Sequence, residues 1–357
     1  MSLRIAFVPR RETSALRRVL TPVLALVVAV LIGGLIVALM GKSPLTAFRV
    51  FILDPLTDPW AMQEVLLKAT PLTLIAIGLL FCFRASRWNI GAEGQFLLGG
   101  ICGGGVAILA HGMTGFWILP AMLIAGALGG LAYAAIPAVL RTRFGISEIL
   151  TSLMLVYVAD LLLDYLVRGP WRDPKGFNFP QSVAFSDSAV LQPLFEGGRL
   201  HAGLLLALAA VLVAFVLFRR TLFGFAVSAS GDAPRAANFA GFNESRITVL
   251  VFLISGALAG LAGVVEVSGQ VGQLRPGFGQ GLGFTAIIVA FLGRLTPAGA
   301  GLSAIVIAVL LIGAESAQVT LKLPFDLTRF FMGLLLLCVL VGESLNRYRL
   351  EIRKGGA

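Results

Sequence analysis

Long apolar segments are the feature of this chain that most constrains its fold. A helix needs about 20 mostly apolar residues to cross a bilayer, and its backbone polar groups must be satisfied within the segment. The chain is 58% hydrophobic and 13% charged, whereas soluble domains are about one quarter charged. We therefore expect an all-α polytopic membrane protein with about ten transmembrane helices and a transmembrane domain over 19–346. The candidate spans are 19–41, 64–83, 88–110, 116–140, 147–166, 201–218, 247–267, 283–293, 300–318 and 328–342.

The basic residues predict how the spans are oriented. Ten spans place both termini on one side, and with the termini inside, the inside segments hold the larger share of the 28 Lys and Arg residues. This predicts a bacterial cytoplasmic (inner) membrane protein with cytoplasmic ends at 1–18 and 347–357. The apolar run 19–41 is too long for a signal-peptide core, so we expect a retained first helix. The net charge of +10 is scattered over segment ends, which does not favour a nucleic-acid partner.

Two similar segments predict an internal repeat. Residues 124–132 and 254–262 differ only at their second and sixth positions. In the span assignment above the first segment runs inward and the second outward, which is typical of an inverted-topology repeat in transporters. Both segments carry glycines four residues apart, a spacing that lets helices approach closely.

Polar residues at membrane depth predict a pathway for a solute. The glycine-rich string 87–100 lies between two apolar segments, and polar groups there are costly unless they line a cavity or find partners. A lining of amides, hydroxyls and aromatic rings suits a neutral, polar, ring-containing solute, and a sugar or a nucleoside would fit equally well. For each acid singly, a structural bond to a neighbouring helix is the competing interpretation. The predicted pathway residues are Asn89, Glu93, Gln95, Glu148, Ser152, Glu266, Gln270 and Phe284.

Three loops add to this prediction. The glycine-rich segment 268–283 cannot hold a spanning helix, so we expect a turn or re-entrant loop that leads into a short half-helix. In the inside loop 219–246, Asp232 as N-cap and Gly241 as stop predict a helix of about two turns, which rests on the bilayer or inserts into a partner. The outer loop 167–200 is a simple connector or a docking surface for an external protein.

The chain shows no signature of an enzyme. Residues 41–43 look like the end of a P-loop, but Ile36 stands where the first glycine is required. The two histidines form no nucleophile–base pair, and no metal-ligand cluster emerges. The three cysteines lie in apolar segments, where packing explains them. We expect no catalytic residues and no cofactor or metal bound by this chain.

The string 87–100 closely resembles one found in permease subunits of ABC importers for nucleosides and simple sugars. The resemblance extends over about 60–345 and includes the segments 148–159, 232–241, 264–269 and 283–297. Within that family it is similar to permeases that work with binding proteins of the basic membrane lipoprotein type. The resemblance implies import of a purine nucleoside or related base, delivered by a periplasmic substrate-binding protein.

The same resemblance implies partners. A cytoplasmic ABC ATPase would hold ATP and Mg, and a second homologous permease would form a heterodimer with this chain. The short helix in the inside loop resembles the coupling helix that docks on the ATPase, and the residues this assigns to coupling are Asp232, Ala233, Pro234, Arg235, Ala236, Ala237, Phe239 and Gly241. The family often has Asn where this chain has Ser147 and Val156, so a nucleobase, a vitamin-like ring compound or a sugar stays open.

Two other functions are compatible with the residues. An ion-coupled secondary transporter would work by titration of Glu93, Glu148 or Glu266 and would fail on Glu93→Gln. A structural or assembly subunit would use its acids only to hold helices together.

Overall fold

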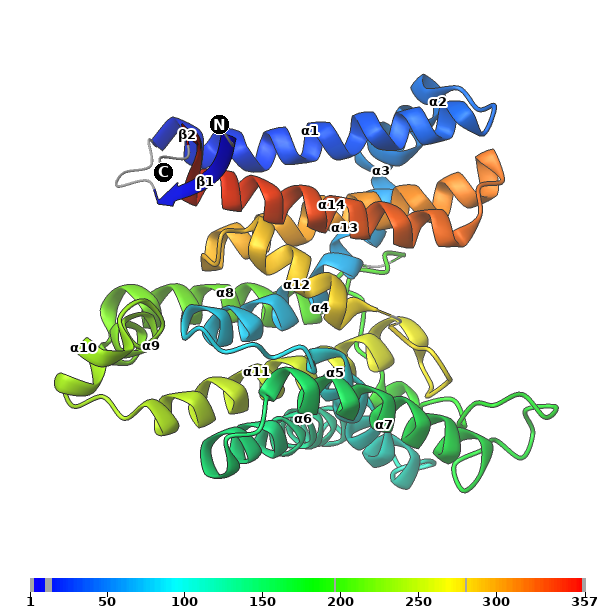
Figure 1. Cartoon of the computed structure of the whole chain (residues 1–357). Coiled ribbons are helices and arrows are strands. Elements are labelled where there is room, and N and C mark those ends of the chain that lie inside the picture. The colour runs from blue at the N-terminus through cyan, green and yellow to red at the C-terminus, as the bar shows by residue number, and fades with distance from the viewer. Residues whose placement is uncertain (1–2, 10–14, 196, 280, 355–357) are drawn as a thin grey trace. The chain divides into compact units, whose positions relative to one another are not determined.

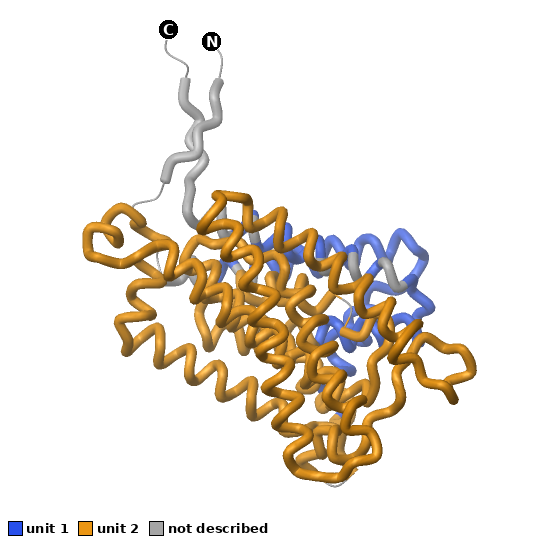
Figure 2. The backbone as a smooth tube through the Cα atoms, turned by 90° about the horizontal axis from the view of Figure 1, so that it is seen from below, with its two compact units in different colours: residues 1–58, 309–357 blue, residues 59–308 orange. Residues whose placement is uncertain are grey.

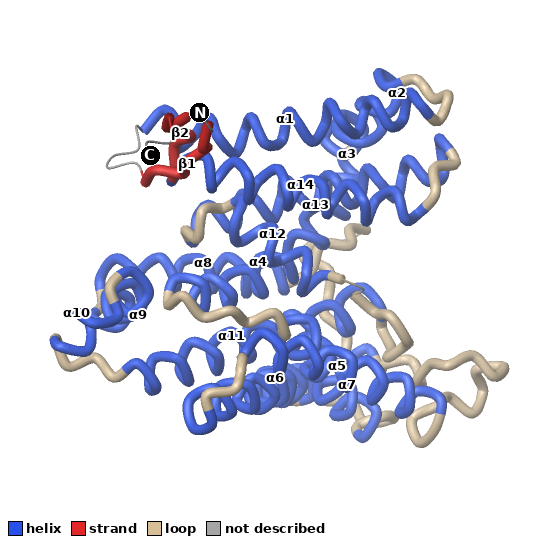
Figure 3. Tube along the Cα trace, viewed as in Figure 1, coloured by secondary structure: helices blue, strands red, loops and turns tan. Residues whose placement is uncertain are grey.

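Helices make up nearly all of the structure (Figures 1 and 3). The computed structural model describes residues 3–9, 15–195, 197–279 and 281–354. Each predicted span coincides with one helix, which confirms the polytopic all-α class. The ten helices are α1 (Ala15–Leu39), α4 (Pro59–Arg84), α5 (Ala92–Leu109), α6 (Ile118–Phe144), α7 (Glu148–Arg168), α8 (Gly203–Arg220), α11 (Glu244–Glu266), α12 (Leu282–Leu292), α13 (Pro297–Leu321) and α14 (Phe325–Arg347). In the described part of the chain, seven helices are long and apolar enough to cross a membrane: α4, α5, α6, α7, α8, α11 with its extension to Val271, and α13.

The remaining elements are short. They are α2 (Pro44–Phe48), the π-helix η1 (Arg49–Leu53), α3 (Asp54–Thr57), the 3-10 turn η2 (Asp187–Ala189), α9 (Leu222–Asp232), α10 (Pro234–Phe239) and the π-helix η3 (Val267–Val271). Two strands, β1 (Leu3–Pro9) and β2 (Tyr348–Lys354), pair antiparallel, which the sequence analysis did not predict. This pairing places the two ends of the described chain side by side. The rest of the predicted terminal segments, 1–2, 10–14 and 355–357, lies outside the described residues.

The chain divides into two compact units (Figure 2). The first comprises 1–58 and 309–357, and the second comprises 59–308. In the first unit α1 packs against α14, and an apolar cavity of about 600 Å³ lies among α1, α2, α13 and α14. The second unit contains all the predicted pathway and coupling residues, so it positions the candidate site.

A seam of glycines joins α6 and α11 in the second unit. A Cβ atom on Gly130 would collide with the carbonyl oxygen of Gly256, and one on Gly260 with that of Gly126. The lower-numbered glycine of one pair therefore meets the higher-numbered glycine of the other, which means that the helices cross antiparallel. The two copies of the repeat pack directly on each other in opposite directions, as an inverted repeat requires.

The eighth predicted span is not a full span. α12 has 11 residues, and at about 1.5 Å per residue it is roughly 16 Å long, about half of the hydrocarbon layer. The preceding connector contains Gly272, Gly277, Gly279 and Gly281 with positive φ, which ends the α11–η3 helix and turns the chain into α12. The glycine-rich segment thus leads into a half-helix, as its composition predicts.

Candidate substrate pathway and coupling surface

The carboxylate of Glu93 holds the N-terminus of the half-helix α12. Its Oε1 accepts the backbone N–H of Gly281 at 2.8 Å and its Oε2 accepts that of Gly283 at 2.6 Å. The side chain is 6% exposed. The first N–H groups of a helix lack partners and carry partial positive charge, so a buried carboxylate is stabilised there. Glu93 therefore joins the start of α5 to the start of α12, two segments far apart in the sequence.

Asn89 and Gln95 form a reciprocal pair of amides. The Nδ2 of Asn89 donates to Oε1 of Gln95 at 2.9 Å, and the Nε2 of Gln95 donates back to Oδ1 of Asn89 at 3.1 Å. Asn89 also donates to Oγ of Ser255 on α11 at 3.0 Å and accepts the N–H of Gly91. Both amide side chains are fully buried. The buried amides of the string 87–100 therefore have partners within this chain, and Asn89 anchors the segment 87–91 to α11.

Glu148 and Ser152 lie near the start of α7, where the chain returns from α6. The Oε2 of Glu148 lies 3.3 Å from Nε of Arg141 at the end of α6. The Oγ of Ser152 accepts the N–H of Ile90 at 3.3 Å, so α7 contacts the same extended segment 87–91. Both side chains are buried.

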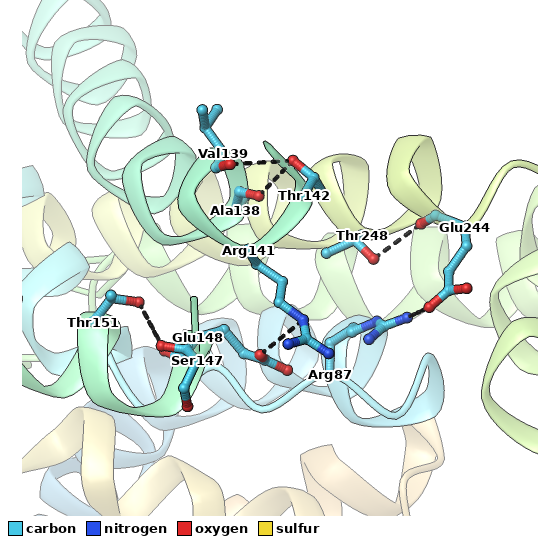
Figure 4. Close-up of polar contacts among 10 residues, drawn as sticks. All are labelled: Arg87, Ala138, Val139, Arg141, Thr142, Ser147, Glu148, Thr151, Glu244 and Thr248. Atoms are coloured by element: carbon cyan, nitrogen blue, oxygen red, sulfur yellow. Dashed lines mark hydrogen bonds and ion pairs between the residues drawn. The ribbon is translucent and has the colours of Figure 1, made fainter. Parts of the chain in front are cut away.

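A second ion pair uses Arg87, an arginine expected to pair with an acid, but its partner was not predicted. Arg87 pairs with Glu244, the first residue of α11, and Figure 4 shows this pair in one close-up with Arg141 and Glu148. The two pairs tie the segment 87–91 to the start of α11, and the end of α6 to the start of α7. The sequence signal was limited to charges at segment ends, and which charges meet depends on the fold.

The other predicted pathway residues occupy different surroundings. Glu266 is buried on α11, and its Oε1 lies 3.9 Å from Nζ of Lys68 on α4. Gln270 is half-buried in η3, and Phe284 is 39% exposed on the first turn of α12. Of the predicted set, Gln270 and Phe284 are therefore the two that present side-chain surface outside the packed interior.

An aromatic cluster stands next to these residues. The rings of Phe83, Trp88 and Phe291 lie 5.0–5.9 Å apart between centroids. Trp88 is 43% exposed, so the cluster presents a flat apolar surface between α4, α12 and the segment 87–91. Trp88 lies in the string 87–100 but was not among the predicted pathway residues, because a single tryptophan in an apolar sequence carries no signal of its own.

The predicted coupling loop forms two helices instead of one. α9 ends at Asp232, and α10 begins after Ala233, which occupies the N-cap position without a side-chain bond. The prediction that Asp232 caps the short helix is therefore wrong, because the preceding residues continue a helix that runs through it. Gly241 follows α10 with a φ of +87°, as expected for a stop.

The α9–α10 pair has one packed and one exposed side. Ala237 is buried, whereas Phe239 is 94% exposed and Arg235 is exposed. Gly231 packs directly on the carbonyl oxygen of Arg84, and Oγ of Ser86 donates to the carbonyl oxygen of Gly231 at 3.2 Å. The helix pair therefore rests on the end of α4 and the α4–α5 connection, while Arg235 and Phe239 on its outer side are exposed.

These features define a class of protein. A set of apolar helices of membrane length, a half-helix beginning inside the packed unit, and an exposed helix pair on a loop are typical of transporters that pass solutes between helices. Residues 61–340 match the protein family described as the permease component of the branched-chain amino acid transport system, and the chain belongs to this family.

Curated relatives agree with this assignment. A glucose ABC transporter permease of Haloferax volcanii is 38% identical over 99% of this chain and 95% of its own length. A guanosine ABC transporter permease of Bacillus subtilis is 28% identical over 96% of this chain and 99% of its own, and a nucleoside permease of Lactococcus lactis is 28% identical over 84% of each. No solved structure matches the chain. The chain is thus an ABC transporter permease subunit in a membrane, and such a subunit is not itself an enzyme.

Proposed function

We propose that this permease passes a neutral solute containing a sugar ring, with a purine nucleoside as the first candidate and a free hexose as the second. The observation that carries this proposal is the contact between Glu93 and α12. The N-terminus of a half-helix is the feature that transporters use to hold anionic substrate groups. Here the carboxylate of Glu93 occupies the N-terminus of α12, so the partial positive charge of this helix end is not available to an anionic solute.

The names of three relatives support a solute that contains a sugar ring. The permeases with nucleoside names and the one with a glucose name share a cargo that contains a sugar ring. The exposed rings of Trp88 and Phe284 supply surface on which a sugar or base can stack. The greater identity to the glucose permease is the specific reason to keep a hexose as the second candidate.

The partners follow from the family. We propose that a cytoplasmic ATPase holding ATP and Mg docks on the α9–α10 pair, and that a second homologous permease completes a heterodimeric pathway. A periplasmic binding protein would deliver the solute on the opposite face, where residues 169–202 lie. The termini would then be cytoplasmic, in the inner membrane, as the distribution of basic residues predicts.

The contacts provide a route from the ATPase to the pathway. A force on Phe239 would reach Gly231 and Ser86 through α9 and α10. Residues 87–91 continue from there to the buried amide pair and to Glu93, which holds α12. The segment 87–91 is therefore the expected lever between ATP-driven closure and movement of the half-helix.

The test of coupling uses Phe239→Ala and Arg235→Ala in the assembled transporter, reconstituted in proteoliposomes. Both side chains are exposed, so we expect the complex to fold while uptake falls and ATP hydrolysis no longer responds to solute. Phe144→Ala is the matched control, because Phe144 is 70% exposed at the end of α6 and outside the helix pair. Full ATP-driven uptake in both test variants would contradict the proposal.

The solute is tested by competition in the same proteoliposomes. Labelled guanosine and labelled glucose are offered with unlabelled competitors, including their phosphorylated forms. We expect one of the two neutral compounds to be taken up and the phosphorylated forms to compete poorly. Uptake of a phosphorylated or carboxylated compound in preference to both would exclude a neutral cargo while leaving the coupling result intact.

The ion-coupled carrier considered from the sequence has less support. The chain belongs to an ABC permease family, and each acid it would use lies beside a structural partner: Glu93 on α12, Glu148 beside Arg141, and Glu266 beside Lys68. Glu93→Gln distinguishes the two mechanisms. As an ABC permease, the folded fraction of the variant should retain ATP-dependent uptake. As an ion-coupled carrier, the variant should lose solute uptake altogether.

A further inference from the structure

The loop 169–202 ends in an exposed tip that is both aromatic and basic. Phe177 is 93% exposed and Phe179 is 66% exposed, and Arg172 and Lys175 are exposed beside them. Large apolar side chains at such exposure are typical of contact sites when they gather in one patch. Aromatic residues and arginine are also the types enriched in protein interfaces. The tip surrounds an open hollow of about 530 Å³.

The tip has a defined conformation. The N–H of Lys175 donates to Oδ1 of Asp173 at 2.9 Å, which closes a turn, and Phe177 and Asn178 both adopt positive φ, at +47° and +69°. Left-handed backbone is unfavourable for a bulky residue, and here the turn is closed by a hydrogen bond from the N–H of Phe179 to the carbonyl oxygen of Gly176 at 2.8 Å. At the base of the loop, Trp171 packs on Gly105 of α5. Phe177 thus lies exposed on a hydrogen-bonded turn.

A row of hydrogen bonds fastens the loop to the connector before α12. The N–H of Ser182 donates to the carbonyl oxygen of Leu274 at 2.8 Å, and the N–H of Leu274 donates to Oγ of Ser182 at 2.9 Å. Phe185 donates to Gly272 and Leu191 to Ser268 in the same row. A displacement of the loop therefore acts on residues 268–274, and through the connector on the helix that Glu93 holds.

We propose that residues 172–179 form the docking surface for the substrate-binding protein, and that the Ser182–Leu274 contact relays docking to α12. The partner that fits has an apolar depression for the two phenylalanines and an acidic rim for Arg172 and Lys175. This inference rests on the proposed function, because it assigns a location to one of the partners proposed there. It adds a route by which loaded binding protein stimulates the ATPase from the far side of the membrane.

The experiment uses the whole transporter in nanodiscs, with substrate-loaded binding protein titrated against ATP hydrolysis. The double variant Phe177→Ser and Phe179→Ser should raise the concentration for half-maximal stimulation about tenfold or more, as expected for loss of two aromatic anchors. Basal hydrolysis and co-purification of the ATPase should not change. Phe116→Ser is the matched control, because Phe116 is 94% exposed in the neighbouring α5–α6 connection. The single variant Phe177→Trp, which keeps an aromatic ring at the tip, should show the same concentration dependence as the wild type.

A second variant separates relay from docking. Ser182→Ala removes the side chain that accepts the N–H of Leu274, so maximal stimulation should fall while the half-maximal concentration stays near that of the wild type. Added salt should weaken docking of the wild type and should have less effect after Arg172→Gln and Lys175→Gln.

Several outcomes would overturn the proposal. An unchanged titration in the double serine variant, or an equal loss in Phe116→Ser, would show that the tip is not the docking surface. A defect that varies with nanodisc lipid composition and not with binding-protein concentration would assign the phenylalanines to the membrane. Absence of any co-purifying ATPase would instead refute the proposed function. Basal ATP hydrolysis, measured in the same preparation, distinguishes this failure from a failure of docking.

Discussion

Individual buried residues in this permease act mainly as connections between distant segments. Asn89 bonds to both Gln95 and Ser255, and all three are fully buried, while Glu93 bonds to the backbone of the connector before α12. Buried polar groups are stable only when they are satisfied, and removal of one partner leaves the others exposed to the cost of desolvation. The consequences of mutation at these positions should therefore follow the number of partners that are lost.

Glu93 gives the clearest case at this scale. Glu93→Ala leaves the N–H groups of Gly281 and Gly283 without their acceptor, so we expect a loss of about 1–3 kcal/mol in stability. Glu93→Gln keeps one acceptor oxygen, so its stability should lie between that of Glu93→Ala and that of the wild type. The apparent melting temperature of the detergent-solubilised complex measures this order. A Glu93→Gln protein less stable than Glu93→Ala would contradict the assigned role.

His201 predicts a dependence of stability on pH. It is 2% exposed just before α8, its Nδ1 accepts the N–H of Gly203, and burial lowers its pKa from 6.5 to about 4. The unfolded chain therefore binds more protons than the folded chain between these two values, so stability is complete above about pH 6.5 and falls as the pH drops towards 4. Thermal unfolding at about pH 7 and about pH 5 measures this, and His201→Gln should reduce the difference.

Among whole elements, the glycine seam between α6 and α11 decides how closely the core helices approach. An added methyl group on Gly256 meets the carbonyl oxygen of Gly130, a backbone atom that cannot move aside as the end of a flexible side chain can. We expect Gly256→Ala to lower the amount of folded protein in the membrane several-fold. Gly301→Ala on α13 is the matched control, because its nearest neighbour would lie 3.6 Å away. Fluorescence-detected size-exclusion chromatography compares the two, and equal profiles would contradict a packing role for the seam.

The elements were largely predictable, and their partners were not. Apolar length located all ten helices, and the glycine-rich segment before α12 indicated a half-helix. The sequence also placed Asn89, Glu93 and Gln95 at depth because their polarity stands out from the apolar segments around them. It could not show that Glu93 bonds to Gly281 and Gly283, because that contact joins residues 188 and 190 positions apart. The α9 helix was missed for a different reason, since its residues 222–232 lack the charge pattern that marks a surface helix.

At the scale of the whole molecule, the second unit contains a continuous set of contacts between its two ends. The α9–α10 pair contacts the α4–α5 connection, which leads to Glu93 and α12, and the connector before α12 is bonded to the loop 169–202. Double variants should therefore show coupling between distant sites. We expect Ser182→Ala to reduce stimulated hydrolysis in the wild type but to have little further effect in Phe239→Ala, where communication is already lost. Additive losses in the two variants would indicate independent roles.

The closed N-terminus of α12 also bears on how a cell keeps what it takes up. A solute that gains a phosphate group after entry becomes an anion, and the half-helix has no unpaired positive end to receive it. On the pathway proposed above, a kinase acting on the proposed cargo inside the cell would make passage irreversible, because the modified compound could not return past α12. Retention would then follow from a single carboxylate that the permease keeps for itself.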